Sequence, residues 1–117
     1  MTDMITLPNI DSSMIANNLT PYKPTHPGEL LREELEERNL SQAKFARQIG
    51  ISASLLNEVI NGKRAVNTEL ALLLEAALSI SAEIWLGLQA DYNMQVTKSD
   101  SAFMQRLADI RRVVAVL

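Results

Sequence analysis

The side chains best suited to a chemical task lie on a predicted helix that follows Ser52, and the task they suit is contact with a nucleic acid. The outward face of this helix carries small or polar side chains, short enough to approach the floor of a DNA groove: Ala53, Ser54, Asn57 and Glu58. The turn that follows offers backbone amides and two cations, Lys63 and Arg64, to a phosphate backbone. The segment therefore predicts a DNA-facing helix with a phosphate-binding turn at its end.

The distribution of charge supports this interpretation, although the whole chain is acidic. The formal net charge is −3, which alone argues against a polyanionic partner. Residues 41–67, however, carry four cations and a single acid, a local sum of +3. Binding to DNA depends on such a local basic surface, because cations displace the counterions of the phosphates they meet. The acidic remainder is typical of a solvated surface and would also complement a basic protein partner.

No other group of residues predicts catalysis or metal binding. The chain has no cysteine and one histidine, His26, which excludes thiolate ligands, a cysteine nucleophile and a pair of histidine ligands. We expect His26 to cap a helix or to be exposed. The glutamates at 33–37 form a solvated helix face, because adjacent helical residues do not converge on one point. We therefore expect no enzymatic activity, metal, cofactor or small-molecule substrate.

Caps and apolar periodicity predict a helical chain that follows a tail at residues 1–25, flexible or docked on a partner. Six helices are expected, at about 27–39, 42–49, 53–61, 68–78, 82–97 and 102–117. Their predicted N-caps include Thr25 or His26, Ser41, Ser52, Asn67 or Thr68, and Ser81. These elements predict an all-α fold: a five-helix domain at 26–97 and an amphipathic C-terminal helix at 98–117.

The last predicted helix has an apolar seam with the 4, 3, 4, 3 spacing of a coiled-coil-like contact: Phe103, Leu107, Ile110, Val114 and Leu117. This seam could fold back on its own domain or contact another molecule, and both alternatives stay open. Trp85 and Tyr92 on the preceding helix are expected in the core.

The second and third predicted helices meet the steric requirements of a helix-turn-helix. Ala46 is small where the two helices approach each other closely, and Gly50 lies in a turn that needs a positive φ. Apolar residues on both helices face inward: Phe45, Ile49, Ile51, Leu56 and Val59. As a set, these residues predict a helix-turn-helix much more strongly than any two of them would.

Residues 42–64 resemble the helix-turn-helix of the Cro/phage-repressor-like, or XRE, family, including its Asn-Gly-Lys turn. A narrower resemblance, to the HigA antitoxins of bacterial toxin–antitoxin modules, covers about 60% of the chain. Four segments carry it in order: HPGELL at 26–31, LSQ at 40–42, LNEVINGKR at 56–64 and IWLGLQADYN at 84–93. The resemblance implies a lambda-repressor-like fold and a dimeric DNA-binding repressor that neutralises a cognate HigB-type ribonuclease.

The resemblance also implies a role for each residue of the motif. Gln42 would bond a phosphate and brace the recognition helix, and the backbone would also be contacted by Ser52, Asn61, Lys63 and Arg64. Asn57 would pair with adenine, Glu58 would accept from cytosine N4 and Ala53 would touch a thymine methyl, with Ser54 beside them. No arginine points from this helix into the groove, which favours modest affinity per monomer and a dimer.

Three functions are compatible with the sequence. The first is a cytoplasmic antitoxin that represses its own operator and binds its toxin. The second is a repressor with the same DNA site and no toxin. The third is a helical protein-interaction module without DNA binding, which would show no salt-dependent binding to DNA from its own promoter. No apolar run approaches the roughly 20 residues that span a bilayer, so we expect no membrane partner.

Overall fold

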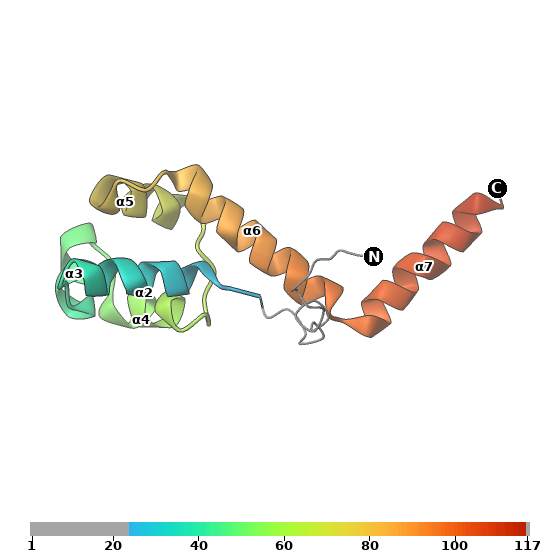
Figure 1. Ribbon diagram of the computed structural model, residues 1–117, viewed down its shortest axis with the longest axis horizontal. Helices are drawn as coiled ribbons and strands as arrows, with labels where there is room; N and C mark the ends of the chain where they lie inside the picture. The colour runs from blue at the N-terminus through green and yellow to red at the C-terminus, as the bar shows by residue number, and fades with distance from the viewer. Residues whose placement is uncertain (1–23, 117) are drawn as a thin grey trace, which may run out of the picture.

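The computed structural model describes residues 24–116, which are helical and contain no strand (Figure 1). The helices are α2 (Pro27–Glu37), α3 (Gln42–Ile49), α4 (Ala53–Ile60), α5 (Thr68–Leu78), α6 (Ala82–Lys98) and α7 (Ser101–Ala115). The predicted all-α fold class is confirmed. Most of the predicted tail, residues 1–23, lies outside the described residues, as does Leu117.

A side chain accepts a hydrogen bond from the first turn of each of these helices, which explains where they begin. The N-caps are His26, Ser41, Ser52, Asn67, Ser81 and Asp100. Of the predicted alternatives for an N-cap, His26 rather than Thr25 caps α2, and Asn67 rather than Thr68 caps α5. Helix α2 ends earlier than expected because Asn39 has a φ of 55°, in the left-handed region that a helix cannot continue.

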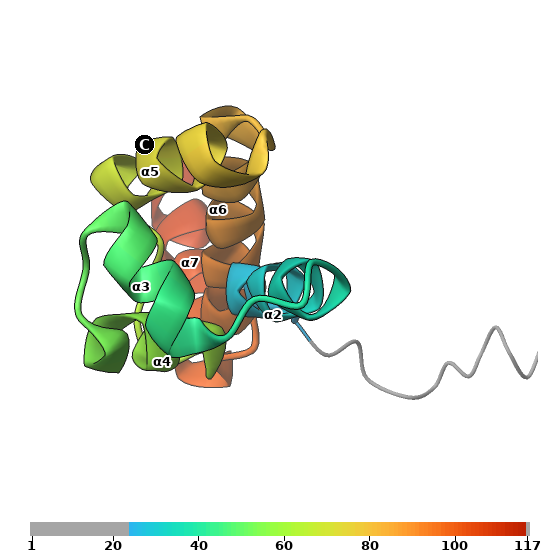
Figure 2. The same cartoon turned by 90° about the vertical axis from the view of Figure 1, so that its left-hand side faces the viewer.

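The core is built from helices α2 to α6 and from Val66 in the loop before α5. Its largest fully buried side chain is that of Trp85, whose Nε1–H donates to the carbonyl oxygen of Ile80 at 3.1 Å. The other members are Leu31, Leu35, Phe45, Ala46, Leu56, Val59, Ile60, Leu70, Ala71, Leu74, Leu78 and Ala82. Figure 2 shows α3 and α4 next to each other, with α5 above α3 and α2 to the right.

Helix α2 approaches the end of α4 more closely than any side chain would allow. A Cβ atom on Gly28 would lie 2.0 Å from the carbonyl oxygen of Val59. The glycine in the first turn of α2 is therefore required by packing, and it brings α2 against the C-terminal end of α4.

Helix α7 leaves the end of α6 and projects away from the core (Figure 1). None of its described residues is buried, and several of its large apolar side chains are exposed: Phe103, Ile110, Val113 and Val114. The predicted seam therefore does not fold back on its own domain. The division of the chain into 26–97 and 98–117 remains a prediction. No described helix has the length and apolar composition needed to cross a membrane.

Candidate nucleic-acid interface

Helices α3 and α4 and the turn between them form the predicted helix-turn-helix. Gly50 ends α3 with a φ of 79°, and its N–H donates to the carbonyl oxygen of Ala46 at 2.9 Å. The N–H of Ile51 donates to the same oxygen at 3.0 Å. Because only glycine adopts this φ at little cost, the predicted reason for Gly50 is confirmed. Ala46 is 1% exposed, as its place between the helices requires.

The inner and outer faces of the motif lie as the sequence predicts, with one difference. Ala53, Ser54 and Asn57 are exposed, whereas Glu58 is only partly so. On the inner face Phe45, Leu56 and Val59 are buried, and Ile49 and Ile51 are partly buried. Ser52 caps α4 by accepting from the N–H of Leu55 at 3.0 Å. This leaves the hydroxyl proton of Ser52 to be donated to a phosphate.

A chain of side-chain amides joins three of the predicted site residues. Asn61 Nδ2 donates to Asn57 Oδ1 at 3.1 Å, and Asn57 Nδ2 donates to Gln42 Oε1 at 3.2 Å. Gln42 begins α3, so this chain connects the two helices of the motif along the exposed side of α4. The hydrogen bond from Asn57 to Gln42 is the contact through which Gln42 would brace α4.

Arg32 of α2 continues this chain and was not expected from the sequence. Its Nη2 donates to Asn61 Oδ1 at 2.8 Å and lies 3.5 Å from the carbonyl oxygen of Ile60. A cation at this place is favourable, because the free carbonyls at the C-terminal end of α4 carry partial negative charge. The two residues are 29 positions apart, so no local spacing in the sequence could have signalled the contact.

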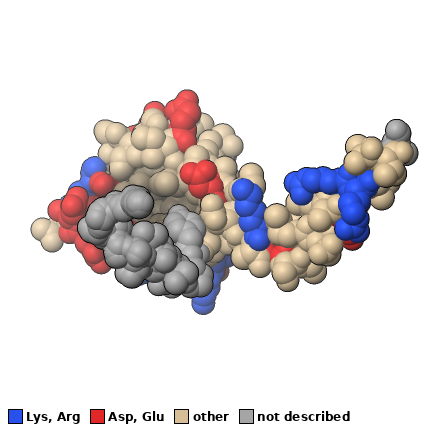
Figure 3. Space-filling model, turned by 45° about the vertical axis from the view of Figure 1, so that its right-hand side comes forward, with Lys and Arg blue, Asp and Glu red and all other residues tan. Residues whose placement is uncertain are grey.

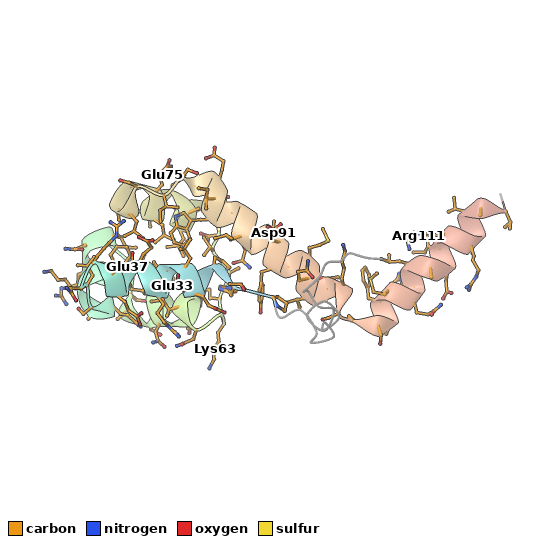
Figure 4. The ribbon with its side chains drawn as sticks, in the orientation of Figure 1. Glu33, Glu37, Lys63, Glu75, Asp91 and Arg111 are labelled. Atoms are coloured by element: carbon orange, nitrogen blue, oxygen red, sulfur yellow. The ribbon has the colours of Figure 1, made fainter. Side chains whose placement is uncertain are left out.

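Two predicted site residues pair with each other. Arg64 Nε donates to Glu58 Oε1 at 2.8 Å, and the two side chains are 52% and 41% exposed. At that exposure the pair contributes about 0–1 kcal/mol to stability. Arg64 also compensates the negative charge of a carboxylate on the partly exposed side of α4. Lys63 follows Gly62, which has a φ of 75°, and its side chain points away from the domain (Figure 4).

His26 supports the turn after α4 from the inside. Its ring is 5% exposed and meets that of Tyr92 edge-on at 4.8 Å, and its Nδ1 accepts from the N–H of Gly28 at 2.9 Å. Burial lowers the pKa of His26, while Glu29 and a backbone bond to Arg64 raise it to a smaller extent. The prediction of a helix cap is confirmed, and that of an exposed side chain is wrong. Within residues 24–116 no three acidic or histidine side chains gather as metal ligands would.

The charges around the motif are local, as the sequence predicts. Lys44 and Arg47 are exposed on α3, and Lys63 and Arg64 follow α4. Acidic side chains lie over the rest of the domain, whereas the cations in the C-terminal part gather on α7 and the end of α6 in the view of Figure 3. The basic surface next to α4 therefore belongs to a largely acidic domain.

Comparison with known proteins identifies the family. The HTH_3 helix-turn-helix family model matches residues 31–85. Virulence-associated protein A′ of Dichelobacter nodosus is 35% identical over 72 residues, which make up 61% of this chain and 63% of that protein.

Two solved structures from Pseudomonas aeruginosa share the fold. The antitoxin HigA with the higBA promoter is 31% identical with a TM-score of 0.64, covering 73% of this chain and 91% of that one. PA4674 in complex with its operator DNA is 32% identical with a TM-score of 0.62, covering 70% of this chain and 87% of that one. The chain belongs to the HTH_3 helix-turn-helix family of non-enzymatic regulators, as a DNA-binding protein similar to HigA antitoxins and to operator-binding regulators.

Proposed function

We propose that this protein is the cytoplasmic antitoxin of a HigBA-like module, a dimer that represses its own operator and neutralises a cognate ribonuclease. The observation that carries the DNA-binding part is the exposed face of α4, with Asn57 held in one orientation by hydrogen bonds on both sides. The toxin-binding part rests on the similarity to HigA proteins. Neither part requires catalysis, because the mechanism is occupancy of an operator and of a toxin surface.

In this proposal α4 lies in the major groove and its exposed residues read bases. Asn57 Oδ1 has a second lone pair and its Nδ2 a second proton, so both remain available to adenine N6–H and N7. Ala53 and Ser54 are short enough to let the helix approach the base edges. Glu58 would accept from cytosine N4 while it stays bonded to Arg64.

The remaining site residues contact the sugar-phosphate backbone at both ends of α4. At its start, Gln42 and Ser52 lie at the N-termini of α3 and α4, where free backbone N–H groups attract phosphate. At its end, Asn61, Lys63 and Arg64 supply an amide and two cations. These contacts fix the register of the helix in the groove without reading sequence.

A dimer follows from the affinity that one such face provides. Helix α4 carries no arginine, so the strong bidentate contact to guanine is missing from its base-reading side. Two copies on one duplex would double the contacts, with half-sites about 34 Å apart, one helical turn. The operator is therefore expected to be an inverted repeat with that spacing.

The toxin is expected to meet the acidic part of the surface. A ribonuclease must bind an RNA backbone and is therefore expected to be basic, and the acidic side chains of α2, α5 and α6 provide the complementary charge. The exposed ones include Glu33, Glu36, Glu75, Glu83 and Asp91. Charge of this kind would mainly accelerate association and select the partner.

Co-expression with the product of the neighbouring gene tests the proposal. We expect a stable complex of the two proteins, and we expect the antitoxin alone to bind the shared promoter as a dimer. Promoter binding together with no complex between the two co-expressed proteins would support the repressor that acts alone. Absence of salt-dependent DNA binding would overturn the DNA-binding proposal and leave the interaction module.

A further inference from the structure

The hydrogen-bonded chain Arg32–Asn61–Asn57–Gln42 can run in only one direction, and its direction is decided by Arg32. A guanidinium carries five donors and no acceptor. Asn61 must therefore turn its oxygen toward Arg32, and the 2.8 Å bond from Arg32 Nη2 to Asn61 Oδ1 is of this kind. An amide whose oxygen is fixed has its nitrogen fixed as well.

Each following amide inherits this orientation. Asn61 offers its Nδ2 to Asn57, which must accept through Oδ1, at 3.1 Å. Asn57 then has only its Nδ2 to offer to Gln42, which accepts through Oε1, at 3.2 Å. The Nε2 protons of Gln42 are left at the far end of the chain, at the N-terminus of α3. That end is a donor, as contact with a phosphate requires.

We infer that Arg32 is a positioning residue for DNA recognition, which locks the amide of Asn57 in the orientation that reads adenine. The inference rests on the proposed function, since it concerns how the DNA-binding face is kept ready to bind. Arg32 acts through Asn61 and does not itself read a base. It holds Oδ1 of Asn57 as the acceptor that adenine N6–H requires and Nδ2 as the donor for N7.

The lock works against thymine, which has the acceptor O4 where adenine has its amino group. To donate to that acceptor, Asn57 would have to exchange its oxygen and nitrogen. The exchange would set nitrogen against the nitrogen of Asn61 and oxygen against the oxygen of Gln42. Asn61 cannot follow, because its oxygen is bound to a group that only donates. Thymine is therefore met without a compensating hydrogen bond at O4.

Two substitutions of Arg32 test whether the direction of its hydrogen bond to Asn61 matters, or only the presence of that bond. Glutamine at this position both donates and accepts, so all three amides could reverse together, whereas lysine only donates and keeps the lock. Arg38 provides the matched control: it lies on the same helix, is also exposed, and donates to the carbonyl oxygen of Leu78 at 3.0 Å. Its other bonds go to Glu34, away from the amide chain.

The binding experiment uses full-length protein and a duplex that the wild type selects from a random-sequence pool, with single-base variants of that duplex. Arg32→Gln is expected to lower the preference for adenine over thymine at one position by about fivefold, the worth of one hydrogen bond. Arg32→Lys and Arg38→Gln should retain the wild-type preference. The slope of log K against log salt should be unchanged in all three variants.

Two results in this assay would overturn the inference. The first is an Arg32→Gln variant that discriminates between bases as well as the wild type. The second is a slope of log K against log salt that is lower in Arg32→Gln than in the wild type by about 0.9, because Arg32 would then contact a phosphate directly.

The side-chain amide resonances of the free protein give a readout that does not depend on DNA. In ¹⁵N-resolved NMR spectra, Arg32→Gln is expected to shift the NH₂ resonances of Asn61 and Asn57, whereas Arg38→Gln leaves them in place. Unchanged resonances in Arg32→Gln would refute the lock. If the wild type selects no duplex, the proposed function fails, and these spectra still decide whether Arg32 orients the amides.

Discussion

Replacing Lys63 by alanine is expected to weaken binding to all DNA sequences alike and to reduce its dependence on salt. The side chain of Lys63 is exposed, points away from the domain and forms no ion pair with a carboxylate of the described residues. Its whole charge is therefore available to one phosphate. Losing that contact should lower the slope of log K against log salt by about 0.9. Between about 50 and 200 mM salt, this amounts to a difference of about 3.5-fold in affinity.

Arg64→Ala is expected to weaken binding more than Lys63→Ala does, although each removes one cation. The reason is the 2.8 Å pair with Glu58: without Arg64, an uncompensated carboxylate faces the phosphates. Adding Glu58→Gln to the Arg64→Ala variant should therefore restore part of the lost affinity. The combined Lys63→Ala and Arg64→Ala variant should lose about 1.8 from the salt slope if both residues contact phosphate.

Fluorescence anisotropy with a labelled duplex, measured over a series of salt concentrations, provides these slopes. Lys98→Ala is the control, because it removes the same charge from the last turn of α6, in a different helix from the motif. Its slope should equal that of the wild type. A Lys63→Ala slope that also equals the wild-type value would show that the turn after α4 does not bind phosphate, and the proposed docking of α4 would be wrong.

Three further predictions test the site and the fold. Asn57→Ala should cost about 1–3 kcal/mol of binding at one base position only, and a uniform loss across operator variants would show that Asn57 does not read sequence. Gly28→Ala should destabilise the fold by about 3 kcal/mol, because the added Cβ would lie 2.0 Å from a backbone oxygen. Gly87→Ala is the control, because a Cβ added there would have no atom of a neighbouring residue within 4 Å. It should stabilise the protein by about 0.5–1 kcal/mol in thermal or urea unfolding. Because burial lowers the pKa of His26 from 6.5, its contribution to stability is complete above that pH and is lost as the pH falls through the folded-state pKa. His26→Asn keeps a helix cap but does not titrate. In this variant the free energy of unfolding, measured with urea at a series of pH values, should depend less on pH below 6.5. An unchanged pH dependence would exclude His26 as the cause.

The features that could be predicted from the sequence are those decided within a few residues. A helix start depends on one side chain and the next three N–H groups, and so Ser41, Ser52 and Ser81 identified three starts. The turn at Gly50 was equally predictable, because a positive φ there favours glycine whatever packs around it.

The features that could not be predicted depend on packing between distant parts of the chain. The burial of His26 against Tyr92 requires α6 to cross the start of α2, and the bond from Arg32 to Asn61 requires α2 to lie along α4. The pairing of Glu58 with Arg64 spans only six residues, yet it depends on how the chain turns at Gly62. From the sequence, Glu58 and Arg64 were each predicted to contact DNA, and no pairing between them was expected.

These long-range contacts share one place, the C-terminal end of α4. Gly28 lets α2 approach the carbonyl of Val59, His26 packs beneath Gly62, and Arg32 bonds Asn61. The other end of α4 is held differently, by the Ser52 cap and by the bond between Asn57 and Gln42. A recognition helix of eight residues would be marginal in isolation. Because both of its ends are fixed by other elements, its exposed side chains can meet DNA without first paying the entropy of ordering the helix.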